Sequence, residues 1–82
     1  MKVVNLNELE NTGTVVALTR NGVFRRKLVS MGIYPGAKVR VLRRGPFGNP
    51  IEVMVGNSLV AIRGDSARFV LVKVENGEEE NA

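Results

Sequence analysis

The side chains that most often carry out catalysis are missing from this sequence. It contains no His and no Cys, whereas acid–base and nucleophilic catalysis draw on those residues or on a Ser, Lys and carboxylate set with tuned pKa values. Ahead of the last eight residues, the acids are few and scattered: Glu8, Glu10, Glu52 and Asp65. We therefore expect this protein not to be an enzyme.

The same absences argue against a metal centre. Zn²⁺ and other transition metals are held mainly by Cys thiolates and His imidazoles. A calcium loop needs a higher density of oxygen ligands than the scattered acids provide. We expect no bound metal and no other cofactor.

A glycine- and proline-rich segment, residues 45–50 (Gly-Pro-Phe-Gly-Asn-Pro), is the most distinctive run in the chain. It lacks the Lys-Ser/Thr pair of a phosphate-binding P-loop and joins two predicted strands instead of a strand and a helix. It is either a stiff connection only, or a preorganised loop whose Pro46 and Gly48 present Phe47 as an apolar contact. A stiff loop loses little entropy when it docks.

Basic residues supply the other candidate contacts. Residues 1–74 carry all 12 Lys and Arg with only four acids, so this part has a formal charge of +8. Such a body attracts nucleic acid, an acidic protein face or an anionic membrane surface, although the charge can also serve solubility alone. The arginines that we consider for partner binding are Arg25, Arg26, Arg43 and Arg44.

These residues must be positioned by short elements, of which one is a helix predicted over residues 23–31. Its apolar residues recur at helical spacing: Phe24, Leu28 and Met31. Gly32 follows, where a helix end favours the left-handed conformation. Pro35 and Gly36 fit the two central positions of a type II turn. We assign structural roles to Gly32, Pro35 and Gly36.

The other segments alternate apolar and polar residues as β-strands do. Strands are expected at residues 14–18, 38–44, 51–55, 58–62 and 69–74, and one helical turn at residues 5–9. Gly56-Asn57 is a two-residue hairpin signal that pairs Val53 with Val60. Arg63 has an expected structural role, bracing a tight turn before the last strand.

About five short strands and one short inserted helix predict a mostly β fold, a small SH3-like, partly open barrel. Residues 1–75 form this domain, and residues 76–82 are expected to be a disordered acidic tail. There is no signal-peptide pattern and no apolar stretch long enough to span a bilayer. The absence of Cys fits a reducing compartment, so we expect a cytoplasmic protein.

Three motifs resemble segments of the FeoA family. Residues 25–36 (RRKLVSMGIYPG) are similar to its RRxLxxMGxxPG segment, and residues 43–51 (RRGPFGNPI) to its RxxPxGxPI loop. Residues 60–63 (VAIR), with Ala67, are similar to its LALR…A segment. The three occur in the family's order and spacing. Ser30 and Asn49 stand where the family usually or often has Asp, which weakens any idea of a cation site there, and Phe47 stands where Leu is common.

The resemblance implies an SH3-like barrel and a role in bacterial ferrous iron uptake. The protein would be a non-catalytic adaptor that docks on the cytosolic, GTPase-bearing region of a FeoB-type membrane transporter and modulates it, touching the membrane only through this partner. Whether it stimulates GTP hydrolysis, gates transport or aids assembly stays open. The same domain forms the C-terminal part of iron-dependent repressors of the DtxR type. The helix-turn-helix and the metal ligand set of such repressors are missing from this sequence.

Two alternatives to the transport adaptor stay open at this point. The first is a basic SH3-like nucleic-acid-binding module, although few aromatic residues are interleaved with the basic ones, as single-strand binding requires. The second is weak self-association, because the exposed edge of an open barrel invites strand pairing.

Overall fold

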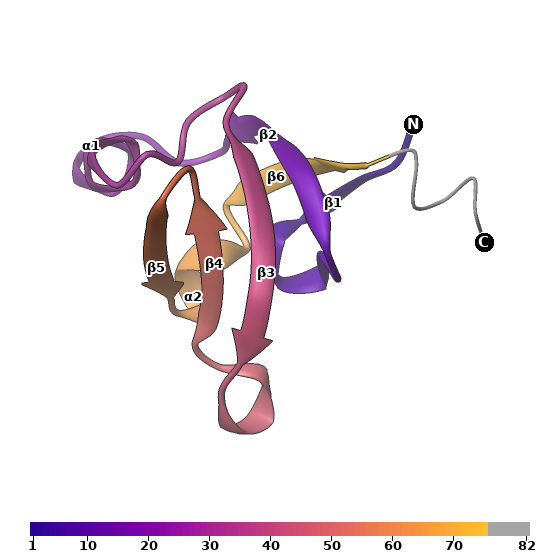
Figure 1. Ribbon diagram of the computed structural model, residues 1–82. Helices are drawn as coiled ribbons and strands as arrows, with labels where there is room; N and C mark the ends of the chain where they lie inside the picture. Colours follow the sequence, from indigo (N-terminus) through magenta and orange to yellow (C-terminus); the bar gives the residue numbers. More distant parts are fainter. Residues whose placement is uncertain (76–82) are drawn as a thin grey trace.

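Six antiparallel strands form one curled sheet in the order β1-β6-β2-β3-β4-β5 (Figure 1). The computed structural model describes residues 1–75, so the acidic tail expected at residues 76–82 lies outside the described part. The strands are β1 (Val3–Asn5), β2 (Thr12–Leu18), β3 (Lys38–Arg44), β4 (Ile51–Val55), β5 (Ser58–Ile62) and β6 (Val70–Val74). The strands at the two ends of this order, β1 and β5, do not pair with each other, so the barrel is partly open, as predicted.

Helical segments lie between the strands. The predicted helix is confirmed as α1 (Val23–Ser30), which joins β2 to β3. The segment expected as a tight turn before the last strand contains α2 (Gly64–Ala67). Two 3₁₀ turns complete the set, η1 (Leu6–Glu8) after β1 and η2 (Pro46–Gly48) between β3 and β4. No helix among residues 1–75 is long and apolar enough to cross a membrane.

The hairpin of β4 and β5 has the predicted register. Val53 faces Val60 and Ile51 faces Ile62, and each of these side chains is at most 8% exposed. Gly56, at φ +60°, occupies the first central position of the turn, as a type II′ hairpin requires. Turn chemistry and the alternation of apolar residues thus fix the same pairing.

Strand β1 was not predicted. It is three residues long and pairs with β6, with Val3 opposite Lys73 and Val4 opposite Val72. A segment this short shows no alternation that a sequence pattern can detect, and its partner lies about 70 residues away in the chain. The neighbouring β2 also begins earlier than expected, at Thr12 instead of residue 14.

The end of α1 shows how local sequence fixes the path into β3. Gly32, at φ +93°, donates its N–H to the Val29 carbonyl at 3.0 Å, and Ile33 donates to the Leu28 carbonyl at 2.9 Å. These two bonds are the Schellman pattern of a helix C-terminus. Leu28 and Ile33 are buried in the barrel core, so the capped helix is anchored at this end.

The turn that follows has the predicted type II geometry. Gly36 adopts φ +98°, and the Ala37 N–H donates to the Tyr34 carbonyl at 2.9 Å across Pro35. The chain then enters β3, where Val39 is buried. The elements before and after the turn are therefore held by backbone bonds as well as by the core.

Candidate functional site

The connection between β3 and β4 projects from one end of the barrel (Figure 1). Its tip, η2, consists of Pro46, Phe47 and Gly48, which we call the loop tip. The Phe47 side chain is completely exposed, with a relative accessibility of 107%. The ring therefore contributes nothing to the core and is available for contact with another molecule.

The backbone of Phe47 is also unusual. It lies at φ 59°, ψ 27°, in the left-handed region, and is the only residue other than glycine at positive φ among residues 1–75. That conformation costs an L-residue with a side chain roughly 1–2 kcal/mol. A bulky, strained and fully exposed residue is a reason to propose a functional role.

Hydrogen bonds within the loop hold the tip in place. The Gly45 N–H donates to the Pro50 carbonyl at 2.8 Å, and the Gly48 N–H donates to the Gly45 carbonyl at 2.9 Å. The Asn49 N–H donates to the Pro46 carbonyl at 3.2 Å. The tip is thus preorganised by its own backbone, as the stiff-loop prediction requires.

The base of the loop is tied to two other elements. The Gly64 N–H, at the start of α2, donates to Asn49 Oδ1 at 3.0 Å. The Gly64 carbonyl accepts from Asn7 Nδ2 in η1 at 2.9 Å. Sequence reasoning missed these two asparagines, since their partner Gly64 lies 15 and 57 residues away along the chain.

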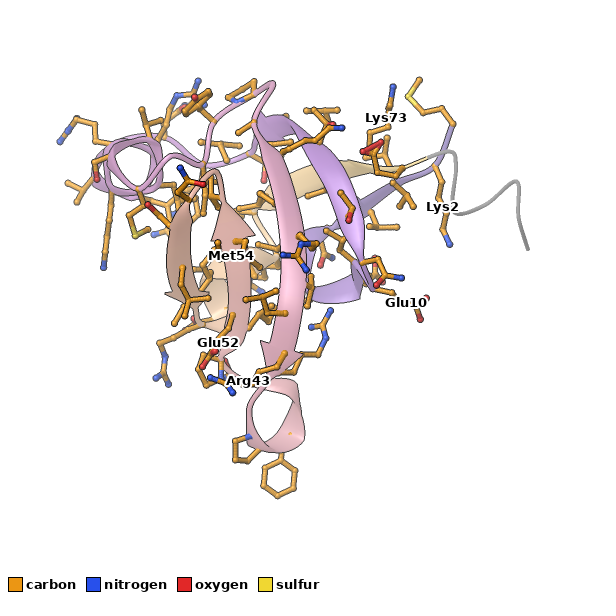
Figure 2. The ribbon with its side chains drawn as sticks, in the orientation of Figure 1. Lys2, Glu10, Arg43, Glu52, Met54 and Lys73 are labelled. Atoms are coloured by element: carbon orange, nitrogen blue, oxygen red, sulfur yellow. The ribbon has the colours of Figure 1, made fainter. Side chains whose placement is uncertain are left out.

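The two arginines before the loop have different surroundings. Figure 2 shows Arg43 beside Glu52 on the adjoining strand, and the Nε of Arg43 donates to Oε1 of Glu52 at 2.8 Å. The Arg43 side chain is 72% exposed, so this ion pair contributes little stability. Arg44 is partly buried, and its Nη2 donates to the Leu9 carbonyl.

Acidic side chains also lie near the loop tip. A shallow hollow beside it is lined by Glu8 and Glu10, together with Arg44 and Phe47. The surroundings of Phe47 are therefore of mixed charge, although the chain as a whole is basic. This arrangement favours an apolar contact framed by charges over a uniformly cationic surface.

The structure does not bring all the predicted partner-binding residues together. Phe47, Pro46, Gly48, Arg43 and Arg44 gather at the loop end of the barrel, whereas α1, which carries Arg25 and Arg26, lies at the opposite end of β3 (Figure 1). The two arginines on α1 thus belong to a separate surface.

Arg63 precedes α2, and its backbone carbonyl accepts from the Ser66 and Ala67 N–H groups at 3.0 and 2.9 Å. Its side chain is exposed, so a bracing role for the guanidinium stays a prediction.

Within the described residues, no three or more His, Cys, Asp or Glu side chains are grouped so that they could hold a metal ion. Near the loop tip, Glu8 and Glu10 line the hollow with one cation, Arg44, and one amide side chain, Asn7, and with no further acid. The geometry of the loop end can therefore present an apolar side chain.

Comparison with known proteins connects this geometry to a family. The family model described as the FeoA domain matches residues 4–74. A crystal structure of an iron uptake regulatory protein (FeoA) is 37% identical, with a TM-score of 0.78, and the match covers 89% of this chain and 97% of that one. No curated protein matches this chain.

Two further structures show how widely the fold is used. Stenotrophomonas maltophilia FeoA complexed with zinc, described as a prokaryotic SH3 domain protein, is 30% identical over 85% of this chain and 89% of that one, with a TM-score of 0.74. A manganese-dependent transcriptional repressor is 25% identical over 89% of this chain but only 42% of that one, with a TM-score of 0.79. The expected SH3-like fold is confirmed.

Proposed function

This chain belongs to the FeoA domain family, associated with ferrous iron transport, and we propose that it is a non-catalytic cytoplasmic adaptor in that process. It docks on the cytosolic, GTPase-bearing region of a FeoB-type ferrous iron transporter and modulates transport. The observation that carries this proposal is the loop tip, where Phe47 is fully exposed on a preorganised turn.

The energetics of an exposed ring favour a docking role. An aromatic side chain buries about 150–250 Å² when it is fully covered. At about 25 cal/mol per Å², that burial is worth several kcal/mol, which is the range of an interface hot spot. Because the loop is already fixed by its backbone bonds, little conformational entropy is lost on docking.

Modulation requires more than contact with the transporter. A ligand changes a conformational equilibrium only if it binds one state more tightly than the other. The adaptor would therefore accommodate Phe47 in a pocket that differs between two states of the transporter's cytosolic region. The names of two relatives agree with a role in regulation: one is called an iron uptake regulatory protein, and the Stenotrophomonas maltophilia protein is put forward as a ferrous iron transport activating factor.

The test is capture of the cytosolic transporter fragment by immobilised full-length protein. Phe47→Ala removes a ring that has no core contacts, so the melting temperature should stay nearly unchanged while binding weakens by about 1–3 kcal/mol. Tyr34→Ala is the matched control, because Tyr34 is also an exposed aromatic residue (47%) but lies in the turn before β3, at the other end of that strand. This control should bind like the wild type.

Three results would contradict the proposal. Normal capture by Phe47→Ala would remove the ring from the interface, and unfolding of this variant would show that the ring supports the core. If the wild-type protein does not bind the transporter fragment but binds RNA tightly at physiological salt, nucleic acid is favoured as the partner. Nucleic-acid binding would also weaken by orders of magnitude between about 50 and 200 mM salt.

A further inference from the structure

A second concave surface lies on the α1 side of the barrel. It is a hollow of about 270 Å³ between α1 and the end of β5, which we call the edge groove. The residues that matter for its chemistry are Phe24, Lys27 and Leu28 from α1 and Met31 directly after it, with Ala61 from β5 and Arg63 directly after that strand. None of these residues belongs to the loop tip, and Ala61 and Arg63 lie at the end of β5 that is next to the base of the loop.

One wall of the edge groove is an unpaired strand edge. In a two-residue hairpin the residues flanking the turn form a hydrogen-bonded pair, and bonded and non-bonded pairs then alternate. Val60 and Ile62 therefore bond to β4, whereas Leu59 and Ala61 direct their backbone N–H and C=O groups away from it. Since β5 is a sheet edge, no strand among residues 1–75 meets these outward groups.

The opposite wall is apolar. Leu28 is nearly buried, and Phe24 and Met31 are partly buried against the core. Phe24 also packs edge-on against Phe69, with 5.5 Å between the ring centroids. The wall is thus held by core contacts and offers apolar surface opposite Ala61, while Leu59 continues the same strand edge beyond the lining of the groove.

The charge around the edge groove is positive. Lys27 and Arg63 line it, and the Arg20 guanidinium, outside the lining, lies 5.9 Å from the centroid of the Phe24 ring. Among the described residues, no acid lines the groove, and Asp65 on α2 lies outside the lining. The complementary ligand therefore carries negative charge next to an apolar group.

We propose that the edge groove binds an extended, acidic segment of a partner protein. The segment adds to β5 as a further antiparallel or parallel strand, through the outward groups of Leu59 and Ala61. It places an apolar side chain against Leu28 and Met31, and a neighbouring carboxylate meets Lys27 or Arg63. This surface is distinct from the loop tip, because none of its lining residues is Pro46, Phe47 or Gly48, although Arg63 directly precedes Gly64, which bonds to Asn49 at the base of the loop.

Other occupants satisfy fewer of these features. A helix already bonds its own backbone groups, so it would leave Leu59 and Ala61 unpaired. A second copy of this chain, added through the same edge, would bring two sets of Lys27 and Arg63 together and be opposed by like charges. A single nucleic-acid strand would match the positive charge but does not offer the alternating donors and acceptors of a β-strand.

The direct test uses synthetic peptides with the full-length ¹⁵N-labelled protein. The probe is an acetylated, amidated heptapeptide of alternating glutamate and leucine, compared with one of alternating lysine and leucine. The glutamate peptide should shift the amide signals of β5 and α1 and bind at least about tenfold more tightly than the lysine peptide. N-methylation of every second peptide amide, on the edge of the peptide strand that faces β5, should weaken binding by about tenfold. Each methylated amide loses the N–H that would donate a hydrogen bond to β5.

Charge reversal on the protein provides the second test. Lys27→Glu combined with Arg63→Glu should weaken the glutamate peptide at least about tenfold and shift the preference toward the lysine peptide. Lys2→Glu combined with Arg40→Glu is the control, since both side chains are exposed and lie outside the edge groove. The control pair should leave the peptide preference unchanged, and matching melting temperatures for both pairs would show that the fold persists.

Four results would overturn this inference. The first two are amide shifts confined to the loop tip or to β1, and binding of the N-methylated peptide as tight as that of the unmethylated one. The other two are a single-stranded DNA oligonucleotide that binds the edge groove more tightly than the glutamate peptide, and a stable dimer of the free protein in sedimentation. Because no transporter fragment is used, failure of Phe47→Ala to affect transporter capture would leave this inference standing.

Discussion

The two connections at the ends of β4 each place a residue at a positive φ of nearly the same value but use very different residues there. Before β4, Phe47 lies at φ 59°, and after β4, Gly56 lies at φ 60°. A side chain is not excluded by crowding at either place, since a Cβ built on Gly56 meets nothing within 4 Å and the Phe47 ring is fully exposed. Space therefore permits a side chain at both positive-φ positions, but only the turn before β4 carries one.

This difference separates a turn that serves the fold from one that presents a side chain. Glycine adopts positive φ without steric cost, so it is the expected residue where the chain only reverses direction. Phe47, in the left-handed region at φ 59°, ψ 27°, is strained and gains no burial in return. The strain is therefore understandable if the ring acts on another molecule, as the proposed function requires.

The largest expected effect lies inside the hairpin that the Gly56 turn closes. Val53→Asp places an unpaired charge opposite Val60 in the core, where Val53 is 0% exposed, and should cost several kcal/mol, enough to abolish cooperative unfolding. Leu59→Asp, on the other face of the same hairpin at 57% exposed, should change stability by less than about 0.5 kcal/mol. Thermal melts of both variants distinguish this register from a one-residue slip of β5, which would turn Leu59 inward and make Leu59→Asp strongly destabilising as well.

Reciprocal substitutions at the two turns test the comparison itself. Gly56→Ala should lower the unfolding free energy by about 1 kcal/mol, since alanine is strained at this φ. Phe47→Gly should be more stable than Phe47→Ala by up to about 1 kcal/mol, because it relieves the same strain. Urea denaturation measures both, and equal stability of the two Phe47 variants would show that the left-handed conformation there is not costly.

Charge reversal on α1 should have a smaller effect that appears in kinetics. Arg25→Glu with Arg26→Glu removes cations that lie away from the loop tip, so the association rate with the transporter fragment should fall about tenfold and become less dependent on salt. The dissociation rate should stay nearly the same, because Phe47 sets it. Stopped-flow or surface-based kinetics check this, and a faster dissociation would instead place α1 inside the interface.

The smallest expected effect is that of iron itself, which should not bind measurably near either turn. With neither His nor Cys in the sequence, the protein should not bind Fe²⁺ with a dissociation constant of about 1 μM or tighter, which would require roughly 8 kcal/mol of site chemistry. Anaerobic calorimetric titration makes this measurement. Tighter binding would contradict this prediction. It would mean that Glu8 and Glu10, near the loop tip, bind Fe²⁺ through oxygen atoms together with further ligands that this fold does not bring to them.

Sequence reasoning succeeded where a structure is determined by neighbouring residues. The hairpin register followed from Gly56-Asn57 and the alternation of Val53 and Val55. The end of α1 followed from Gly32, whose N–H reaches back three residues. In each case the turn residue and the apolar pattern lie within a few positions of each other, so local chemistry is sufficient.

It failed where distant segments meet. Strand β1 exists only because β6 is beside it, and the bond between Asn49 and Gly64 depends on how α2 packs near the loop. The edge groove combines α1 with β5, which the sequence places about 30 residues apart. Phe47 was predicted as a presented ring, but its positive φ has no sequence signal, since glycine or asparagine is the usual residue there.

The pairing of β1 with β6 has a consequence for how this domain can be joined to other proteins. Val3 lies opposite Lys73, and the Val74 N–H donates to the Lys2 carbonyl at 2.9 Å, so the chain enters and leaves the fold at one place. Figure 1 shows that place on the side of the barrel away from α1 and well apart from the loop between β3 and β4. Flanking domains, affinity tags or a host protein's loop can therefore be fused there without covering either candidate binding surface.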